Sequence, residues 1–259
     1  MKYILPLFLL LASCALPPEL EPPSPLESES SVKKEFDTIG EIDGPPVVVA
    51  VYSYLDKTGQ RKPSDNVAHL STAVTQGSEA WVIKALQDVG KGKWFRVVER
   101  VGLDNLVKER QLIRTAREAF EGEKAKELKP LLFAGVIVEG GIISYDSNIS
   151  SGGIGARYLG VGASTQFRQD VVTVFIRMVS VQTGEILIST AVQKTILSVK
   201  TQADVFKFVD MGTRAVESEI GIALNEPTNY AVKAAIEQSV VEMIKEGERK
   251  GIWKRKEQT

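Results

Sequence analysis

Between Gly140 and Val174 apolar and polar residues alternate with a period of two, along one stretch and then along a second. Successive side chains of a strand point to opposite faces, so this pattern predicts strands with one apolar and one polar face. The apolar positions are Ile143, Tyr145 and Ile149 in the first stretch and Leu159, Val161, Ala163, Thr165 and Phe167 in the second. Three glycines in residues 151–157 predict a turn between the stretches, and the segment is therefore a predicted β-hairpin.

A second hairpin is predicted within residues 188–224. Its ascending strand alternates apolar and polar positions from Leu197, and its descending strand does so from Val216 to Leu224. The expected tip is Phe206–Arg214. Phe206 and Phe208 would lie at a membrane interface if this hairpin crosses a bilayer, and would pack within a loop if it does not.

Two environments produce this alternation. One is an antiparallel sheet on a soluble core, and the other is a wall between lipid and a water-filled lumen. The polar face is solvated in the first case and lines the lumen in the second. The residues on that face are Asp146, Asn148, Ser150, Ser164, Gln166, Arg168, Asp170, Ser198, Lys200, Gln202, Asp204, Glu217 and Glu219.

The length of the arms restricts the membrane alternative. Each predicted arm has about 9–11 residues, the length that a tilted strand needs to cross a bilayer. Four arms cannot close a barrel, because membrane barrels begin at about 8 strands and open strand edges are not tolerated in lipid. If the arms cross a membrane, several copies of the chain must therefore share one barrel.

The remaining pattern predicts a small α/β body, and the expected fold class is α+β. Strands are expected at Val47–Tyr54, Trp94–Glu99, Leu131–Glu139 and Val171–Val181, and helices from Ser71 or Thr72 to Val89, at Leu103–Phe120 and from Asn225 onward. The last helix has an apolar stripe of Val232, Ile236, Val240, Met243 and Ile244. The body then comprises residues 45–140 and 171–187, the hairpins residues 141–170 and 188–224, and the C-terminal helix and tail residues 225–259.

The beginning of the chain has the pattern of a lipoprotein signal peptide. Residues 1–13 contain Lys2 and an apolar run that is too short to span a bilayer, and Leu11-Ala12-Ser13-Cys14 resembles a lipoprotein cleavage box. Cys14, the only cysteine, is the expected lipid anchor, and the alternative is a free thiol. Because Ala15 and not aspartate follows it, we expect an anchor in the outer membrane. Residues 14–44 are rich in Pro, Glu and Ser and predict a semi-extended tether.

The sequence lacks the patterns expected for nucleic-acid binding, nucleotide binding, zinc binding and nucleophilic catalysis. The formal net charge is −1, so no basic surface for nucleic acid is expected. The glycines of residues 151–157 lack the spacing of a dinucleotide site, and no Walker-type phosphate loop is present. One histidine and one cysteine do not make a usual zinc site, and a Ser–His nucleophile pair would have to use His69 in a loop. We therefore expect no enzyme activity and no cofactor apart from the covalent lipid on Cys14.

Several longer stretches resemble the curli secretion channel family, the CsgG lipoproteins, along nearly the whole mature chain. These stretches are residues 98–110, 151–163, 183–187, 194–198 and 225–227. The resemblance implies a nonameric outer-membrane ring with a periplasmic vestibule, in which each copy gives two hairpins to a shared barrel of 36 strands. It also implies export of unfolded curli-type amyloid subunits without nucleotide or ion gradient, together with periplasmic and surface accessory factors as partners.

The family's narrowest point is a loop between the first strand and the first helix, with rings of Tyr, Asn and Phe. By resemblance, this loop corresponds to residues 64–70 here, where Leu70 stands in place of Phe, His69 in place of Asn, and Ser64 or Asp65 in place of Tyr, with Asn66 between them. The aromatic clamp is therefore absent. A ring of leucines would still be an apolar collar that resists ion leakage. His69 would add a ring that charges near pH 6.5, or is an ordinary loop histidine.

A second function class fits the same chain. A periplasmic lipoprotein could act as a scaffold or activator whose α/β body binds an envelope enzyme. The two hairpins discriminate between the classes, because a soluble adaptor has no use for them. A planar-bilayer conductance measurement would separate the two.

Overall fold

The structure, a computed structural model, describes residues 32–61, 72–152, 165–201, 205–210 and 227–256. Six strands form one sheet in the order β2-β1-β3-β4-β5-β6. They are β1 Val47–Asp56, β2 Phe95–Val98, β3 Val136–Gly152, β4 Thr165–Ser180, β5 Ile186–Thr201 and β6 Val205–Asp210. β1 runs parallel to β2 and β3, and the pairs β3–β4, β4–β5 and β5–β6 are antiparallel.

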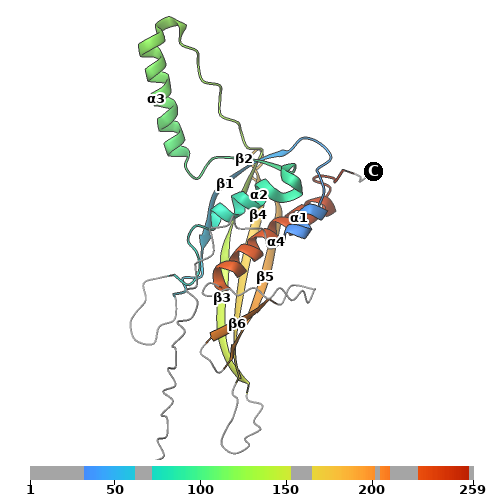
Figure 1. The fold of residues 1–259 in the computed structure, drawn as a ribbon. Coiled ribbons are helices and arrows are strands. Elements are labelled where there is room, and N and C mark those ends of the chain that lie inside the picture. The colour runs from blue at the N-terminus through green and yellow to red at the C-terminus, as the bar shows by residue number, and fades with distance from the viewer. Residues whose placement is uncertain (1–31, 62–71, 153–164, 202–204, 211–226, 257–259) are drawn as a thin grey trace, which may run out of the picture.

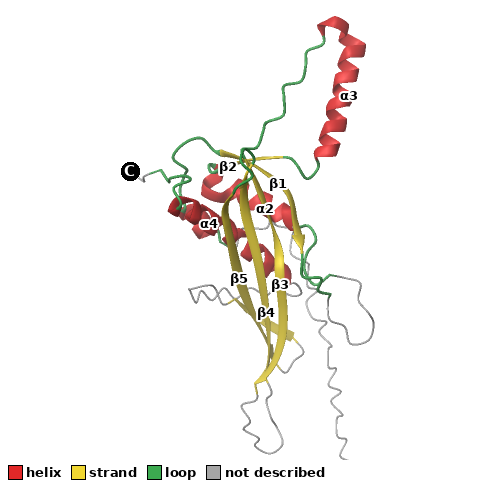
Figure 2. Ribbon diagram, turned by 180° about the vertical axis from the view of Figure 1, so that it is seen from behind, coloured by secondary structure: helices red, strands yellow, loops and turns green. Residues whose placement is uncertain are grey.

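The helices of the body lie on one face of this sheet. They are α1 Lys33–Thr38, α2 Ser78–Gly92 and α4 Pro227–Arg249. Seen from behind, the sheet lies in front of these helices, so among the described residues no helix covers its second face (Figure 2). This mixed α+β architecture agrees with the predicted fold class. No helix in the described ranges combines the length and apolar character needed to cross a membrane.

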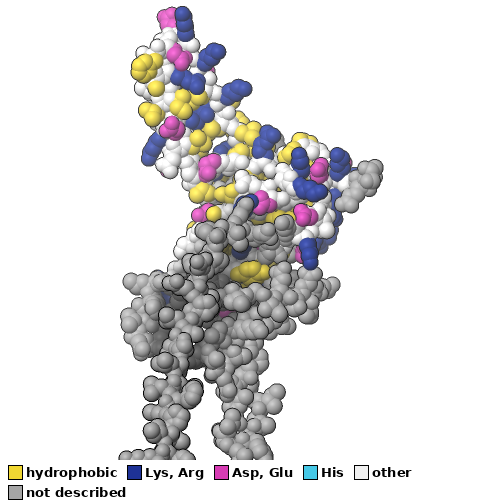
Figure 3. Space-filling view, viewed as in Figure 1, with side chains coloured by type: hydrophobic (Ala, Val, Ile, Leu, Met, Phe, Trp, Pro, Cys, Tyr) yellow, Lys and Arg dark blue, Asp and Glu magenta, His cyan; other side chains and the backbone are white. Residues whose placement is uncertain are grey.

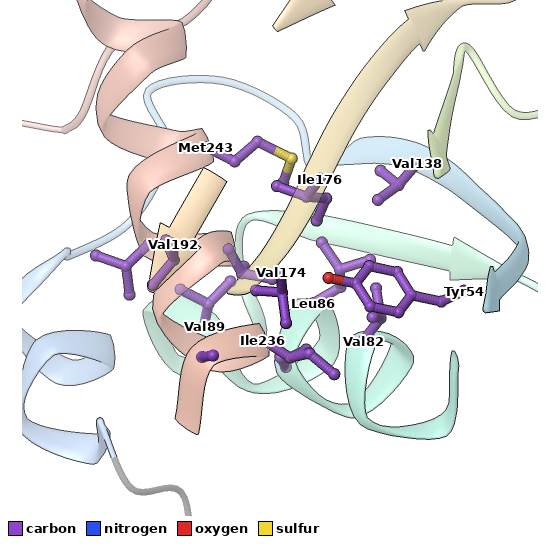
Figure 4. Packing of buried hydrophobic residues seen from close by; sticks show 14 of the residues in the cluster. Tyr54, Val82, Leu86, Val89, Val138, Val174, Ile176, Val192, Ile236 and Met243 are labelled. Atoms are coloured by element: carbon purple, nitrogen blue, oxygen red, sulfur yellow. The ribbon is translucent and has the colours of Figure 1, made fainter. Parts of the chain in front are cut away.

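The core lies between the sheet and the helices (Figure 4). From β4, Val172, Val174, Ile176 and Met178 are fully buried, because every second residue of a strand faces the helix layer. From α4, the predicted apolar stripe is confirmed: all five of its residues are fully buried. Their names are Val232, Ile236, Val240, Met243 and Ile244.

The hairpin of β3 and β4 is a continuation of the body sheet. The two strands pair from Val136 opposite Ser180 to Gly152 opposite Thr165 without leaving the sheet. The antiparallel pairing of two strands, predicted from the alternation, is thus confirmed for the described residues. Of the predicted turn, residues 151 and 152 belong to β3, and residues 153–157 lie outside the described part of the chain. The prediction was wrong at Ile143, which is 46% exposed, because a bulge between Ile142 and Ser144 makes Ile142 the buried residue.

Part of the expected tip of the second hairpin is a strand. β5 pairs with β6, and Thr201 lies opposite Val205. Phe206 and Phe208, which were expected at the tip, belong to β6. The descending strand expected from Val216 lies outside the described residues.

Two helix predictions require correction. α2 begins at Ser78 and not at Ser71 or Thr72, because Thr72 pairs with Arg61 in an isolated bridge and Ala73 and Val74 are buried before the helix starts. The end of the expected tether is also folded. α1 lies within residues 14–44, and Phe36, Ile39 and Ile42 are buried in the core. Their spacing of three residues is a helix-like apolar pattern that a Pro- and Glu-rich context conceals.

The N-terminal segment is held by the end of the chain. The Asp43 amide donates to the Lys254 carbonyl at 2.8 Å, and the Lys256 amide donates to the Glu41 carbonyl at 2.9 Å. Beneath this pairing the rings of Trp94 and Trp253 meet edge to face with centroids 5.7 Å apart. The tail is therefore part of the folded body.

Gly140 allows β1 and β3 to pack closely. A Cβ at this position would collide with the Phe175 carbonyl oxygen and with the ring of Tyr54, whose Cδ2 would be 3.0 Å away. Tyr54 is fully buried, and this burial raises the pKa of its hydroxyl, with the Ser239 side chain acting in the opposite direction. The phenol is therefore neutral, and its ring is enclosed among the core residues.

We predict that Gly140→Ala destabilises the body by about 1–3 kcal/mol, the usual cost of overpacking a well-packed core. Chemical denaturation followed by circular dichroism measures the change. Gly135→Ala is the matched control, since the nearest atom to its Cβ is the Val48 carbonyl oxygen at 3.9 Å. Equal stabilities of the two variants would contradict this account of Gly140.

Candidate functional site

Most of the predicted site residues lie outside the described part of the chain. This applies to the proposed lipid anchor, to the five loop residues and to five of the residues expected in a lumen. They are Cys14, Ser64, Asp65, Asn66, His69, Leu70, Ser164, Gln202, Asp204, Glu217 and Glu219. For Ser150, Gln166, Arg168, Ser198 and Lys200 the strand positions are described. The described residues that flank these positions are the two ends of the predicted pore loop and the base of the first hairpin.

The two ends of the predicted pore loop meet in a narrow neck. Arg61 and Thr72 form an antiparallel bridge, and the Ala73 amide donates to the Gln60 carbonyl at 2.9 Å. The two ends of the ten-residue segment between Arg61 and Thr72 are thus held together, and the segment itself lies outside the described residues.

Asp56, the last residue of β1, joins both sides of this neck. Its Oδ1 accepts hydrogen bonds from the Thr58 amide at 2.8 Å and the Thr58 hydroxyl at 2.7 Å. Its Oδ2 accepts one from the Gln76 side-chain amide at 3.0 Å. One carboxylate therefore fixes the turn that leaves β1 and the segment that returns to α2.

The neck is attached to the base of the first hairpin. The Lys57 amide donates to the Ile142 carbonyl at 2.9 Å, and Asp56 lies opposite Ile142 in the β1–β3 pairing. β1 ends at this point, whereas β3 continues for ten further residues to Gly152. The loop therefore starts where the first hairpin leaves the body.

Sequence reasoning missed this neck, although a signal was present. Asp-Lys-Thr-Gly at residues 56–59 is typical of a turn in which an Asp side chain accepts a hydrogen bond from the amide two residues later. The partner Gln76 lies twenty residues further along the chain. No local pattern identifies a contact at that separation.

Polar side chains of the first hairpin lie on both faces of the sheet. Asp146 and Asn148 are exposed, as expected for a water-facing surface, and the Ser144 hydroxyl donates to Asp146 at 2.8 Å. Asp146 pairs with Val171, whereas Asp170 pairs with Ser147. Since directly paired residues share a face, Asp146 and Asp170 lie on opposite faces.

Asp170 therefore differs from its prediction as a lumen residue. Its side chain is fully buried under α4, and its Oδ1 accepts a hydrogen bond from the Tyr145 hydroxyl at 3.2 Å. The sequence argument failed because it assumed that even-numbered residues of both strands share a face. Beyond the bulge at Ile143, even-numbered residues of β3 pair with odd-numbered residues of β4, as Asp146 does with Val171. Asp170 shares its face with the buried Val172 instead.

A second feature is an arm that stands away from the body (Figure 1). It consists of α3, Leu103–Glu121, the short 3₁₀ turn η1, Gly122–Lys124, and the return segment 125–135. The helix confirms the prediction at Leu103–Phe120, but none of its residues is buried. On its surface apolar side chains alternate with charged ones of both signs (Figure 3).

Three arginines hold the return segment beside the helix. Arg100 donates to the Leu132 carbonyl at 2.9 Å, Arg110 to the Lys129 carbonyl at 2.7 Å, and Arg117 to the Lys126 carbonyl at 2.9 Å. These three acceptor carbonyls are spaced three residues apart. Carbonyls at this spacing point in the same direction in a polyproline-type chain, because it has three residues per turn. A hollow of about 600 Å³ remains between helix and return segment. The arm is thus held by polar contacts and has no apolar core of its own.

We predict that Asp56→Ala loosens the neck and speeds cleavage by trypsin after Arg61 by about tenfold. Losing bonds worth about 1–2 kcal/mol raises the population of a locally opened segment by such a factor. The measurement is the rate of limited proteolysis of the folded protein. Asp88→Ala is the control, because Asp88 accepts a bond only from Lys84 on α2 among the contacts described. Unchanged cleavage in Asp56→Ala would show that the neck does not depend on this carboxylate.

Comparison with known proteins gives a consistent result. A family model described as "Curli production assembly/transport component CsgG" matches residues 43–259. Proteins with the same description from Salmonella typhimurium strain LT2 and Escherichia coli strain K12 are similar. The first is 42% identical over 255 residues, which cover 96% of this chain and 89% of the relative. The second is 41% identical over 256 residues, which cover 97% of this chain and 90% of the relative.

Similarity to solved structures is weak by comparison. The structure of the hypothetical protein CT253 from Chlamydia trachomatis matches with a TM-score of 0.38 at 9% identity, covering 77% of this chain and 96% of that one.

Proposed function

The chain belongs to the CsgG family, and from this premise we propose that it is a curli assembly/transport component that acts as an outer-membrane secretion channel. It exports unfolded curli-type amyloid subunits from the periplasm to the cell surface without nucleotide hydrolysis. The lipid on Cys14 anchors it to the outer membrane, the body faces the periplasm, and accessory factors act on either side.

The observation that carries this proposal is the continuation of the sheet beyond its helix cover. β3 and β4 extend past the fully buried residue Val172 as a paired ribbon. Ser147, opposite Asp170 on the face that the helices cover in the body, is exposed there, and so are Asp146 and Asn148 on the other face. A soluble adaptor gains nothing from such a projection. A shared barrel requires it, because each copy must bring strands that reach the neighbouring copy.

The edges of the projecting sheet support a ring of several copies. After Ile142, where β1 ends, the outer edge of β3 has no strand partner among the described residues. At the opposite side, β6 is the last strand of the described sheet. Two different open edges on one copy favour head-to-tail contacts, and such contacts close into rings when the rotation fits. The nine copies expected from the family resemblance remain a prediction.

The arm supplies a second contact between copies in this proposal. Phe133 is 81% exposed and Leu112 is 62% exposed, although both are large apolar residues. The arm carries cations and anions in similar numbers, so neither an anionic lipid surface nor a nucleic acid is a fitting partner. A second copy of the chain is the partner that the proposed ring already places beside it.

The loop held by the Asp56 neck forms the constriction of the channel. Leu70 supplies an apolar collar, with His69, Asn66 and Ser64 or Asp65 beside it. An apolar constriction dewets and resists ion flow while a flexible chain can still slide through. The polar positions of the hairpins leave few apolar surfaces to which an unfolded passenger would adhere.

We predict single-channel conductance when the detergent-extracted protein is added to a planar bilayer. Leu70→Ser should raise the conductance at least about twofold by wetting the collar. Ile186→Ser is the control, since Ile186 is exposed at the end of the sheet far from the loop. Absence of conductance from a well-formed ring would instead favour a scaffold or activator that binds an envelope enzyme.

We further predict that Leu112→Glu and Phe133→Glu each lower the fraction of ring at least about tenfold, because a charge is then placed in an apolar contact. Native electrophoresis and light scattering in detergent measure this fraction. The stability of the monomer should change by less than about 0.5 kcal/mol, as for other surface substitutions. Val181→Glu, at a residue 53% exposed on the body, is the control. Normal rings in both variants would exclude the arm from the contact.

A further inference from the structure

Asp170 is the charged end of a long apolar series on β4. Toward the body, Val172, Val174, Ile176 and Met178 follow it on the same face, and all four are fully buried. In the other direction Gln169 is exposed, as are Ser147 and Asn148 across from Asp170 and Gln169. Asp170 thus lies where the sheet leaves the helix layer.

Its contacts connect three elements of the fold. The Tyr145 hydroxyl on β3 donates to Asp170 Oδ1 on β4 at 3.2 Å. The Tyr145 oxygen also lies 3.2 Å from the Thr228 hydroxyl on the first turn of α4. Tyrosine has one hydroxyl proton, and the carboxylate receives it, so Thr228 is the donor in the second bond. This network therefore joins the pair of β3 and β4 to the start of α4.

The apolar series alone leaves the register of the hairpin open. Side chains repeat with a period of two, and a slip by two residues therefore keeps every apolar residue of β4 on the buried face. Valine, isoleucine and methionine can replace one another in a core at modest cost. A carboxylate cannot replace them, because a slip would bury it without its partners or expose it outside the helix layer.

We propose that Asp170, with Tyr145 and Thr228, is a lock that fixes the register of β3 against β4 where the sheet leaves the body. Buried polar groups select one arrangement among several in this way in some proteins, at little or no gain in stability. The lock sets how far the first hairpin projects beyond α4. Its consequence for the channel rests on the proposed function, since copies that share a barrel must present hairpins of equal height.

The test compares two cross-strand cysteine pairs in otherwise complete chains. Asn148 and Gln169 lie directly opposite each other and are both exposed, so N148C/Q169C reports the native register. N148C/V171C reports a slip by two residues. In the parent chain we expect disulfide formation almost entirely in the native pair.

Asp170→Val should raise disulfide formation in the slipped pair about tenfold, the factor expected when a hydrogen bond to a buried carboxylate is lost. Its melting temperature should stay equal or rise, because apolar replacement of buried polar groups is often neutral or stabilising. Asp146→Val, the same change on the opposite face, should leave the slipped pair unchanged. A destabilised Asp170→Val that keeps the native register would overturn the proposal, since Asp170 would then serve stability alone.

A second series covers the case in which Asp170→Val does not fold. Thr228→Val removes the hydroxyl at the α4 end of the network, and Thr228→Ser retains it. We expect slipped disulfide in the first variant and recovery of the native register in the second. Native register in both would contradict the lock. These disulfide measurements do not depend on channel activity. A parent protein without conductance would contradict the proposed function, but the test of strand register would remain valid.

Discussion

Backbone pairing along β3 and β4 is the constraint on which the rest of the structure depends. The two strands stay paired from the centre of the body to Gly152, so body and hairpin are one sheet and not two domains joined by a linker. A change in the register of β3 against β4 within the body would change their register in the hairpin by the same amount, because each strand is continuous. Features that position the body strands, such as Gly140 against Tyr54, therefore act on the hairpin together with the proposed Asp170 contacts.

The helix layer divides this continuous sheet into two environments. Under α4 the inner face of β4 is buried without interruption, and beyond Asp170 the described residues of the hairpin are exposed. The loop neck lies close to the same boundary, since Asp56 pairs with Ile142 and the Lys57 amide bonds to it. Loop and hairpin thus start from one rigid region. Their relative position is set by backbone bonds and does not depend on long side chains.

The sequence predicts the architecture better than the details of the site. Alternation revealed the first hairpin, and helical spacing revealed α3 and the buried stripe of α4, because both patterns repeat over many residues. The failures have local causes. One extra residue at Ile143 reversed the faces of β3, so that Asp146 and Asp170 lie on opposite faces. Asp170 shares its face of β4 with the buried Val172 and Val174, and it lies in the core for that reason. The Asp56–Gln76 contact and the folding of Phe36 into the core depend on residues far apart in the chain.

In the described part of a single chain, the arm has no buried residues and the edge of β3 beyond Ile142 has no strand partner. A helix without buried residues, held only by arginine bonds to its own return segment, contributes little to the stability of the body. Large apolar residues such as Phe133 are costly to leave in water, and an open edge such as that of β3 beyond Ile142 invites pairing. Both features become favourable when a second copy covers them. In the ring proposed for this chain these features lie at contacts between copies, whereas in a monomeric adaptor they would remain exposed to water.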